Sequence, residues 1–328
     1  INRYYHHGIT PQLTPLKQYY YQPGPNASIY TFIARNTAPL NSDNENSDTD
    51  TDTASDPVVK FLAYGDLGIK NSENTIDLIK SLTKVNGNAA STTDIDFILH
   101  FGDVAYADDR DIVFPPSNPE YAQIYDDWGN IMEPIFSKIP YMTAPGNHEQ
   151  TCHSWSDWHC HTDLENFTVY REYFRMPLAK NNEMGGGNFN MWWSMDYKNI
   201  HILSISTETD YPGSPDQGGY HNDFINPEAG PFGDQMKFVE NDLKQAFENK
   251  DIKWIIVNGH RPYYTSAHDD DHLDWPPQTP FVLREAFEPL FYKYNVDLYI
   301  SGHIHGYERL YSIYKEDIIT KDYMNPGA

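Results

Sequence analysis

Short apolar runs alternate along this chain with longer amphipathic segments. Five runs have the length and composition of strands buried on both faces, and they cover residues 58–64, 97–101, 139–144, 252–257 and 296–300. Four segments have helical periodicity, at residues 74–85, 121–136, 233–249 and 279–294. In the third of these, Met236, Val239, Leu243 and Phe247 fall on one helical face. The alternation predicts an α/β fold with layers of helix around two packed sheets.

Polar residues with metal-binding chemistry follow the apolar runs. The five segments read Gly65-Asp66-Leu67-Gly68, Gly102-Asp103-Val104-Ala105-Tyr106, Gly146-Asn147-His148-Glu149, Val257-Asn258-Gly259-His260 and Gly302-His303-Ile304-His305. One such segment alone is weak evidence, because an Asp after a strand is most often a helix N-cap. If the runs are parallel strands, however, their carboxyl ends converge on one edge, where open α/β sheets place ligands. Five segments in this order therefore predict one shared site.

The side chains in these segments suit a pair of metal ions. Two ions about 3.5 Å apart need carboxylate, imidazole and amide oxygen ligands, and one group that both ions share. The seven candidate ligands are Asp66, Asp103, Tyr106, Asn147, His260, His303 and His305.

The series resembles the calcineurin-like metallophosphoesterases and, within them, the purple acid phosphatases. Most metallophosphoesterases carry a His two residues after the first Asp, where this chain has Gly68. Tyr106, three residues after Asp103, matches the purple acid phosphatase Gly-Asp-x-x-Tyr motif instead. A phenolate is a hard, anionic donor, so it favours trivalent iron over zinc or magnesium. The resemblance covers the chain from about residue 58 to the C-terminus.

The resemblance implies a metallophosphoesterase four-layer sandwich, in which two mixed sheets are flanked by helices. It also implies a binuclear centre that contains Fe(III) and one divalent metal, which is Zn, Mn or Fe(II) in relatives. By this resemblance, the iron ligands are Asp66, Tyr106 and His305, the divalent-metal ligands are Asn147, His260 and His303, and Asp103 bridges both ions. The implied activity is that of an acid phosphatase, which hydrolyses a small-molecule phosphate monoester by attack of a metal-bound hydroxide.

Two histidines are expected to contact the substrate and act in catalysis. In the family, the residue equivalent to His148 contacts the phosphate ester and can protonate the leaving group. A second His comes from the loop after the fourth segment in relatives, and His268 is the candidate here, with His272 beyond an acidic run. Asp108 could orient its neighbours, but we expect it to be an exposed loop carboxylate.

Three regions are expected along the chain. Residues 1–38 resemble the last strands of the fibronectin-type β-sandwich that precedes the catalytic domain in the larger purple acid phosphatases. Residues 39–57 are rich in Asn, Ser, Asp and Thr and have too few apolar side chains to order themselves, which predicts a disordered acidic linker. Residues 58–328 form the catalytic domain, which is expected to be truncated at its C-terminus.

The net charge and the two cysteines limit the binding partners and the cellular compartment that we expect for this protein. With 47 acidic residues against 23 Lys and Arg, the chain should bind neither nucleic acid nor an anionic membrane surface, and it lacks a transmembrane run. Cys152 and Cys160 could close a disulfide loop, since their spacing fits no common zinc module. Together with sequons at Asn26 and Asn166, they favour a secreted or lysosomal/vacuolar glycoprotein. The family also implies pairing into a homodimer.

Two other functions stay open at this point. The first is a phosphodiesterase or protein phosphatase on the same fold, against which Gly68, Tyr106 and the lack of an Asp-Arg-Gly sequence after the second segment argue. The second is an inactive binding protein on the same scaffold, which a missing ligand would have indicated. The sequence names neither the ester nor the divalent metal.

Overall fold

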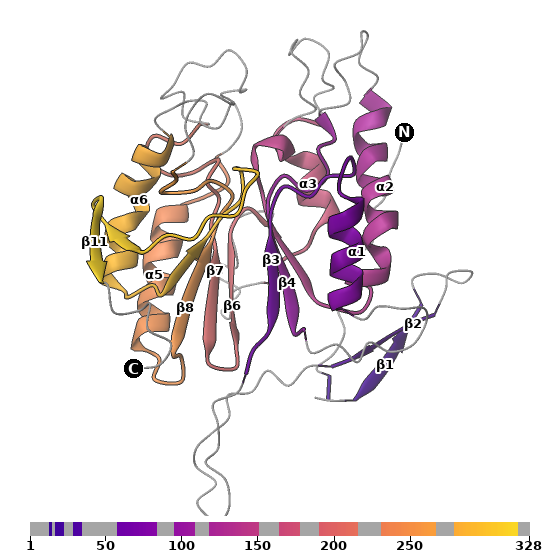
Figure 1. The fold of residues 1–328 in the computed structure, drawn as a ribbon, viewed down its shortest axis with the longest axis horizontal. Helices are drawn as coiled ribbons and strands as arrows, with labels where there is room; N and C mark the ends of the chain where they lie inside the picture. Colours follow the sequence, from indigo (N-terminus) through magenta and orange to yellow (C-terminus); the bar gives the residue numbers. More distant parts are fainter. Residues whose placement is uncertain are drawn as a thin grey trace, which may run out of the picture.

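Two sheets face each other at the centre of the molecule, and helices cover the outer face of each (Figure 1). The computed structural model describes residues 13–14, 17–22, 29–34, 58–83, 95–108, 118–150, 164–177, 190–215, 231–266 and 279–320. The expected α/β class and the two-sheet, helix-flanked architecture are confirmed.

The first sheet has three parallel strands in the order β3-β4-β5. Its strands are β3 (Phe61–Tyr64), β4 (Phe97–Phe101) and β5 (Tyr141–Ala144). The helices α1 (Glu73–Leu82) and α2 (Asn118–Phe136) connect them. The predicted run 58–64 becomes a strand only from Phe61, because Phe61 is the first residue that pairs with β4, at Phe97. Because all three strands run the same way, the segments that follow them leave from one edge.

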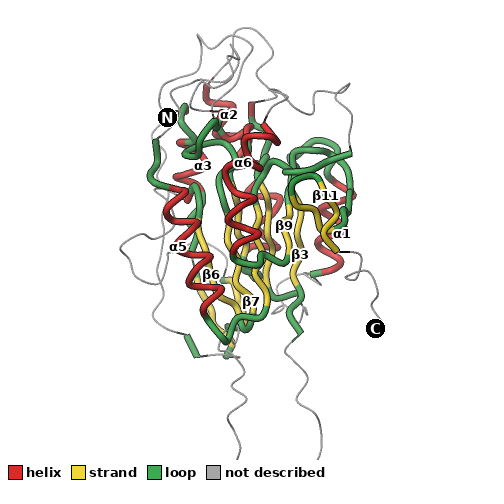
Figure 2. Tube along the Cα trace, turned by 90° about the vertical axis from the view of Figure 1, so that its left-hand side faces the viewer, coloured by secondary structure: helices red, strands yellow, loops and turns green. Residues whose placement is uncertain are grey.

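The second sheet is mixed and has the order β6-β7-β8-β9. Its strands are β6 (Trp193–Tyr197), β7 (Ile200–Ser204), β8 (Trp254–Asn258) and β9 (Leu298–Ile300), and β6 is the antiparallel member. The helices α5 (Gln235–Glu248) and α6 (Thr279–Lys293) lie side by side on its outer face (Figure 2). The four predicted helices are thus all present, with ends that differ by three residues or fewer.

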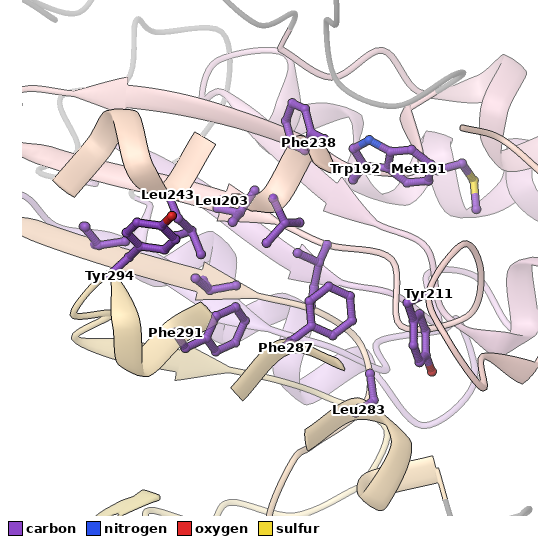
Figure 3. Close-up of a cluster of buried hydrophobic side chains, with 14 of the residues drawn as sticks. Met191, Trp192, Leu203, Tyr211, Phe238, Leu243, Leu283, Phe287, Phe291 and Tyr294 are labelled. Atoms are coloured by element: carbon purple, nitrogen blue, oxygen red, sulfur yellow. The ribbon is translucent and has the colours of Figure 1, made fainter. Parts of the chain in front are cut away.

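Three apolar clusters hold the layers together. Between the sheets, Phe97, Leu99 and Phe101 from one face of β4 pack with Trp193 and Ile202. A second cluster joins the opposite face of the three-stranded sheet to α1 and α2. In the third, drawn in Figure 3, side chains of α5 and α6 meet the outer face of the four-stranded sheet. Both faces of β4 are therefore buried along its whole length, which is why its sequence reads as a nearly continuous apolar run.

Two short antiparallel strand pairs are separate from the two central sheets. Strands β1 (Gln18–Tyr21) and β2 (Tyr30–Ile33) form an antiparallel pair, and the Tyr21 hydroxyl donates a hydrogen bond to the Ser137 carbonyl oxygen, 3.2 Å away beyond the end of α2. Strands β10 (Ser312–Tyr314) and β11 (Asp317–Thr320) form the other antiparallel pair. The short helix α3 (Thr168–Tyr173) contributes the buried Val169 and Tyr170 to two of the apolar clusters. The fibronectin-type assignment and the domain boundaries stay predictions, and the linker 39–57 lies outside the described residues.

A buried histidine makes the stability of the fold depend on pH. The His201 side chain lies between two carboxylates, with Nδ1 2.7 Å from Asp196 Oδ1 and Nε2 2.8 Å from Asp242 Oδ2. Burial alone would lower the pKa of His201, but the two carboxylates outweigh it and raise the pKa to about 9. The unfolded value is about 6.5, so the stabilisation is complete below that pH and is lost as pH rises through the folded-state pKa.

We therefore expect the free energy of unfolding to fall by an order of 2–3 kcal/mol between pH 6 and pH 9.5. Urea denaturation across this range measures it. A His201→Gln variant should be less stable at pH 6 and should show a flatter pH dependence. An equal slope in the variant and the wild type would assign the pH dependence to other groups.

Candidate metal centre

Tight turns in the left-handed backbone region carry several of the predicted ligands. Asp66, Asp103, Tyr106 and His303 have φ angles of 57°, 51°, 49° and 69°. Such angles cost a residue with a Cβ about 1 kcal/mol or more and persist only where the surroundings enforce them, most often at functional sites. Gly146 allows one of these turns to approach closely, because a Cβ at this position would overlap the Asp103 carboxylate.

Four donor atoms from four different turns meet in a first group. His260 Nε2 lies 3.1 Å from Asp103 Oδ2, 3.0 Å from Asn147 Oδ1 and 3.1 Å from His303 Nδ1. The turns follow β4, β5, β8 and β9, so this group joins the two sheets across their carboxyl edges. Asp103 and His260 are 1% and 0% exposed, which places the group at the buried end of the site.

The chemistry of the first group fits a cation. His260 Nδ1 lies 2.7 Å from the Phe101 carbonyl oxygen, which can only accept, so this nitrogen carries a proton and donates it. A proton on Nε2 could serve only one of the three atoms around it, and a neutral ring would present only a lone pair there. A cation at the centre would satisfy a carboxylate, an amide oxygen and two imidazole nitrogens together.

Three further donor atoms form a second group beside the first. The Tyr106 hydroxyl lies 3.1 Å from Asp66 Oδ1 and 2.7 Å from His305 Nε2, and these last two atoms are 3.4 Å apart. Asp66 also accepts a hydrogen bond from the His303 backbone amide at 2.8 Å, which ties the two groups together. The His305 side chain is 64% exposed, so the site opens to solvent at this end.

Burial and neighbouring charges together set the pKa values in both groups. Burial raises the pKa of the Tyr106 phenol far above its usual range, and the charges of Asp103 and Asp66 raise it further. Burial also opposes ionisation of Asp103, but the adjacent His260 and His148 hold the pKa of Asp103 well below its usual range. The charge of Asp103 thus acts on the Tyr106 phenol of the second group as well as on His260 of the first.

His148 lies at the edge of the site and is held by a buried carboxylate. Its Nε2 is 3.8 Å from Asp103 Oδ2, and its Nδ1 is 2.8 Å from both carboxylate oxygens of Asp108. Asp108 is only 5% exposed, so the expectation of an exposed loop carboxylate is wrong. Asp108 instead pairs with His148, which lies 40 positions further along the chain, and the spacing of polar residues does not reveal such a contact.

Three other predicted features lie outside the described residues. They are the substrate-contact candidate His268, the cysteines Cys152 and Cys160, and the sequon at Asn26. The second sequon residue, Asn166, is half-buried in the turn before α3.

Sequence reasoning missed three buried charged residues around the site. Glu149 accepts hydrogen bonds from the turns that carry Asp103 and Asn147. Arg261 pairs with Glu208, with Nε 2.9 Å from Oε1 and Nη2 2.9 Å from Oε2. The Arg261 Nη1 atom also lies 3.2 Å from His303 Nε2. The available signal was a charged residue within two positions of a candidate ligand, since Glu149 follows Asn147 by two residues and Arg261 follows His260 directly.

The segments that carry these donor side chains lie within a match to a known protein family. A family model described as calcineurin-like phosphoesterase matches residues 59–307. This chain belongs to the calcineurin-like phosphoesterase family. The match contains every candidate ligand and His148.

Relatives within this family include acid phosphatases. One from Aspergillus ficuum is 34% identical over 242 residues, which are 59% of this chain and 37% of that protein. Acid phosphatase type 7 of Mus musculus is 31% identical over 276 residues, which are 81% of this chain and 52% of that protein. The chain thus spans about half, or less, of the length of these relatives.

A solved structure supports the fold of this family member. The purple acid phosphatase PPD1 from yellow lupin (Lupinus luteus) seeds has a TM-score of 0.59 at 24% identity, covering 95% of this chain and 48% of that chain. The metallophosphoesterase fold expected from the motif series is confirmed. Every helix in the described part of the chain is too short or too polar to cross a lipid bilayer.

Proposed function

We propose that this chain is the catalytic part of a metal-dependent acid phosphatase that hydrolyses phosphate monoesters. The observation that carries the proposal is the meeting of seven donor side chains in two adjoining groups, which the hydrogen bond from the His303 amide to Asp66 ties together. The acid phosphatase relatives support the same activity. A phosphodiesterase or protein phosphatase on this fold remains the alternative that the assays below separate.

The side chains also support a division of the metal centre into two sites. We infer that Asp66, Tyr106 and His305 hold Fe(III), that Asn147, His260 and His303 hold a divalent ion, and that Asp103 bridges them. The phenol in the second group favours the trivalent ion there. Two carboxylates and one phenolate bring three negative charges against five positive, so the loaded site attracts an anionic ester. Bound ions would supply an activated water molecule and screen the phosphoryl oxygens.

His148 is positioned to act on the leaving group. Asp108 holds its Nδ1, which turns Nε2 toward the carboxylate of Asp103 and the space where an ester would lie. From there, Nε2 donates a proton to the oxygen that leaves with the alcohol, and Asp108 stabilises the charged ring before that transfer. The exposed side of His305 provides the route by which the ester enters.

The proposal is tested by metal analysis and a visible absorption spectrum of the purified protein. We expect one iron and one divalent ion per chain, a broad band in the green to yellow region, and hydrolysis of a monoester such as p-nitrophenyl phosphate. A Tyr106→Phe variant should lose the band, because the phenolate is its source. The control is Tyr197→Phe, which removes a hydroxyl that donates a hydrogen bond to Asp96, at the end of β4 opposite to Asp103.

Two results would contradict it. Wild-type protein with full activity but only zinc or manganese, and no colour, would remove iron from the proposal. Hydrolysis of bis-p-nitrophenyl phosphate without hydrolysis of the monoester would favour the phosphodiesterase.

We also propose a secreted or lysosomal/vacuolar setting, a Cys152–Cys160 disulfide, glycosylation at Asn26 and Asn166, and a homodimer. Two cysteines, two sequons and the negative charge of the chain support this set of predictions. Intact mass before and after reduction and deglycosylation, with light scattering for the dimer, would test it. A single mass under all treatments would contradict the covalent part.

A further inference from the structure

We propose that Glu149 is a positioning residue that holds the two ligand-bearing turns after β4 and β5 in the arrangement that metal binding needs. This inference rests on the proposed metal centre. Glu149 is 1% exposed and occupies the short 3-10 turn Asn147–Glu149, directly after two residues of the site.

The Glu149 carboxylate receives hydrogen bonds from both turns. Its Oε2 accepts from the Asp103 amide at 2.7 Å and from the Gly146 amide at 2.8 Å. Its Oε1 accepts from the Val104 amide at 2.8 Å and from the Tyr125 hydroxyl at 3.1 Å. Three backbone amides that have no strand or helix partner are therefore satisfied by one side chain.

The link between the turns is reciprocal. Glu149, in the turn after β5, accepts hydrogen bonds from backbone amides of the turn after β4. In return, Asp103 Oδ1, in the turn after β4, accepts a hydrogen bond from the His148 backbone amide at 3.0 Å. This bond occupies one oxygen of Asp103 and leaves Oδ2 directed at His260, 3.1 Å away. The bond from the His148 amide to Oδ1 thus determines that Oδ2 is the Asp103 oxygen that faces the first group.

The chemistry at this position requires a carboxylate of this length. Without it, three buried amides would lose their acceptor, at about 1–3 kcal/mol for each unsatisfied group. Glutamine would place an NH₂ group against an amide N–H, because it has only one acceptor oxygen. Whichever way the glutamine amide is turned, either the Asp103 amide or the Val104 amide then loses its acceptor, so the turn after β4 loses at least one of its two bonds to residue 149.

The test compares Glu149→Gln with Tyr125→Phe, which removes a donor to the same carboxylate but leaves all three amide bonds. Zn²⁺ affinity is measured on the folded, metal-free proteins by competition with a chelator. Hydrogen exchange of peptides covering residues 102–106 and 145–149 is measured without metal. We expect Glu149→Gln to weaken Zn²⁺ binding by about 10–100-fold and to lose protection in both peptides, whereas Tyr125→Phe stays within about threefold of the wild type.

The outcomes separate this inference from the proposed function. If folded Glu149→Gln binds Zn²⁺ as the wild type does, or keeps full protection, Glu149 has no positioning role and the metal centre still stands. If the wild type itself binds no metal, the proposed function fails. Should Glu149→Gln not fold, Glu149→Asp keeps the charge and withdraws the carboxylate by one methylene, and wild-type affinity in that variant would overturn the inference.

Discussion

Replacing Asp103 by asparagine is expected to lower kcat/KM for a phosphate monoester by about 10³-fold or more, which corresponds to about 4 kcal/mol of transition-state stabilisation. Asp103 is buried beside His260, accepts the His148 amide and is the proposed bridge between the two ions. The substitution removes a negative charge where two cations are held, so it should also release metal. Initial rates, together with metal analysis after dialysis, measure both effects.

The matched control lies at the opposite end of the same strand. Asp96 precedes β4, is 8% exposed, and accepts hydrogen bonds from the Tyr197 hydroxyl at 2.7 Å and the Lys60 amide at 3.0 Å. Asp96→Asn should reduce stability and leave the metal content unchanged. An Asp103→Asn protein that retains two metals and wild-type activity would show that the bridge assignment is wrong.

Removing the buried Arg261 is expected to cost the metal-free protein about 3–5 kcal/mol in the free energy of unfolding. Arg261 and Glu208 are 2% and 4% exposed, and their side chains share a forked pair of hydrogen bonds. An Arg261→Leu variant leaves the Glu208 charge in the protein interior without its partner. Equilibrium denaturation by urea, in the presence of a chelator, measures the loss without a contribution from metal binding.

The double variant Arg261→Leu with Glu208→Leu distinguishes an unpaired charge from lost packing. Because both charges are then absent, most of the stability should return, to within about 1–2 kcal/mol of the wild type. If the effects of the two substitutions on the free energy of unfolding are instead additive, the cost of Arg261→Leu comes from the lost packing of its side chain and not from an unpaired Glu208 charge. The Arg284→Gln variant, which loses a bond to the Tyr263 carbonyl oxygen, controls for the removal of any guanidinium from this region.

Four helices and five strands were predictable because their signals are local, whereas β6 and β7 lie outside the five predicted apolar runs. The run 97–101 is observed as β4 with the same bounds, and helix α6 ends one residue before its predicted end. Strand starts were less predictable. Val58 and Val59 are apolar enough for a strand, but a strand also needs a partner in the sheet, and pairing begins only at Phe61.

The sequence predicted the candidate metal ligands, but it did not predict the buried charged residues that hold them in place. Each ligand follows a strand, and parallel strands deliver their ends to one edge, so Asp66, Asp103 and Asn147 could be grouped from position alone. Asp108 was misjudged because burial of a loop carboxylate depends on what covers it. The Arg261–Glu208 pair was missed because its members are 53 residues apart.

Residue type and place along the chain determined the α/β class, four helices and five strands in their order, and the seven donor side chains, since apolar periodicity and strand ends are properties of neighbouring residues. Only the tertiary structure decided that these donors divide into two groups, that Asp103 directs Oδ2 at His260, and that Glu149 links two turns. Those features depend on hydrogen bonds between residues 40 or more positions apart, whose geometry exists only once both sheets have packed.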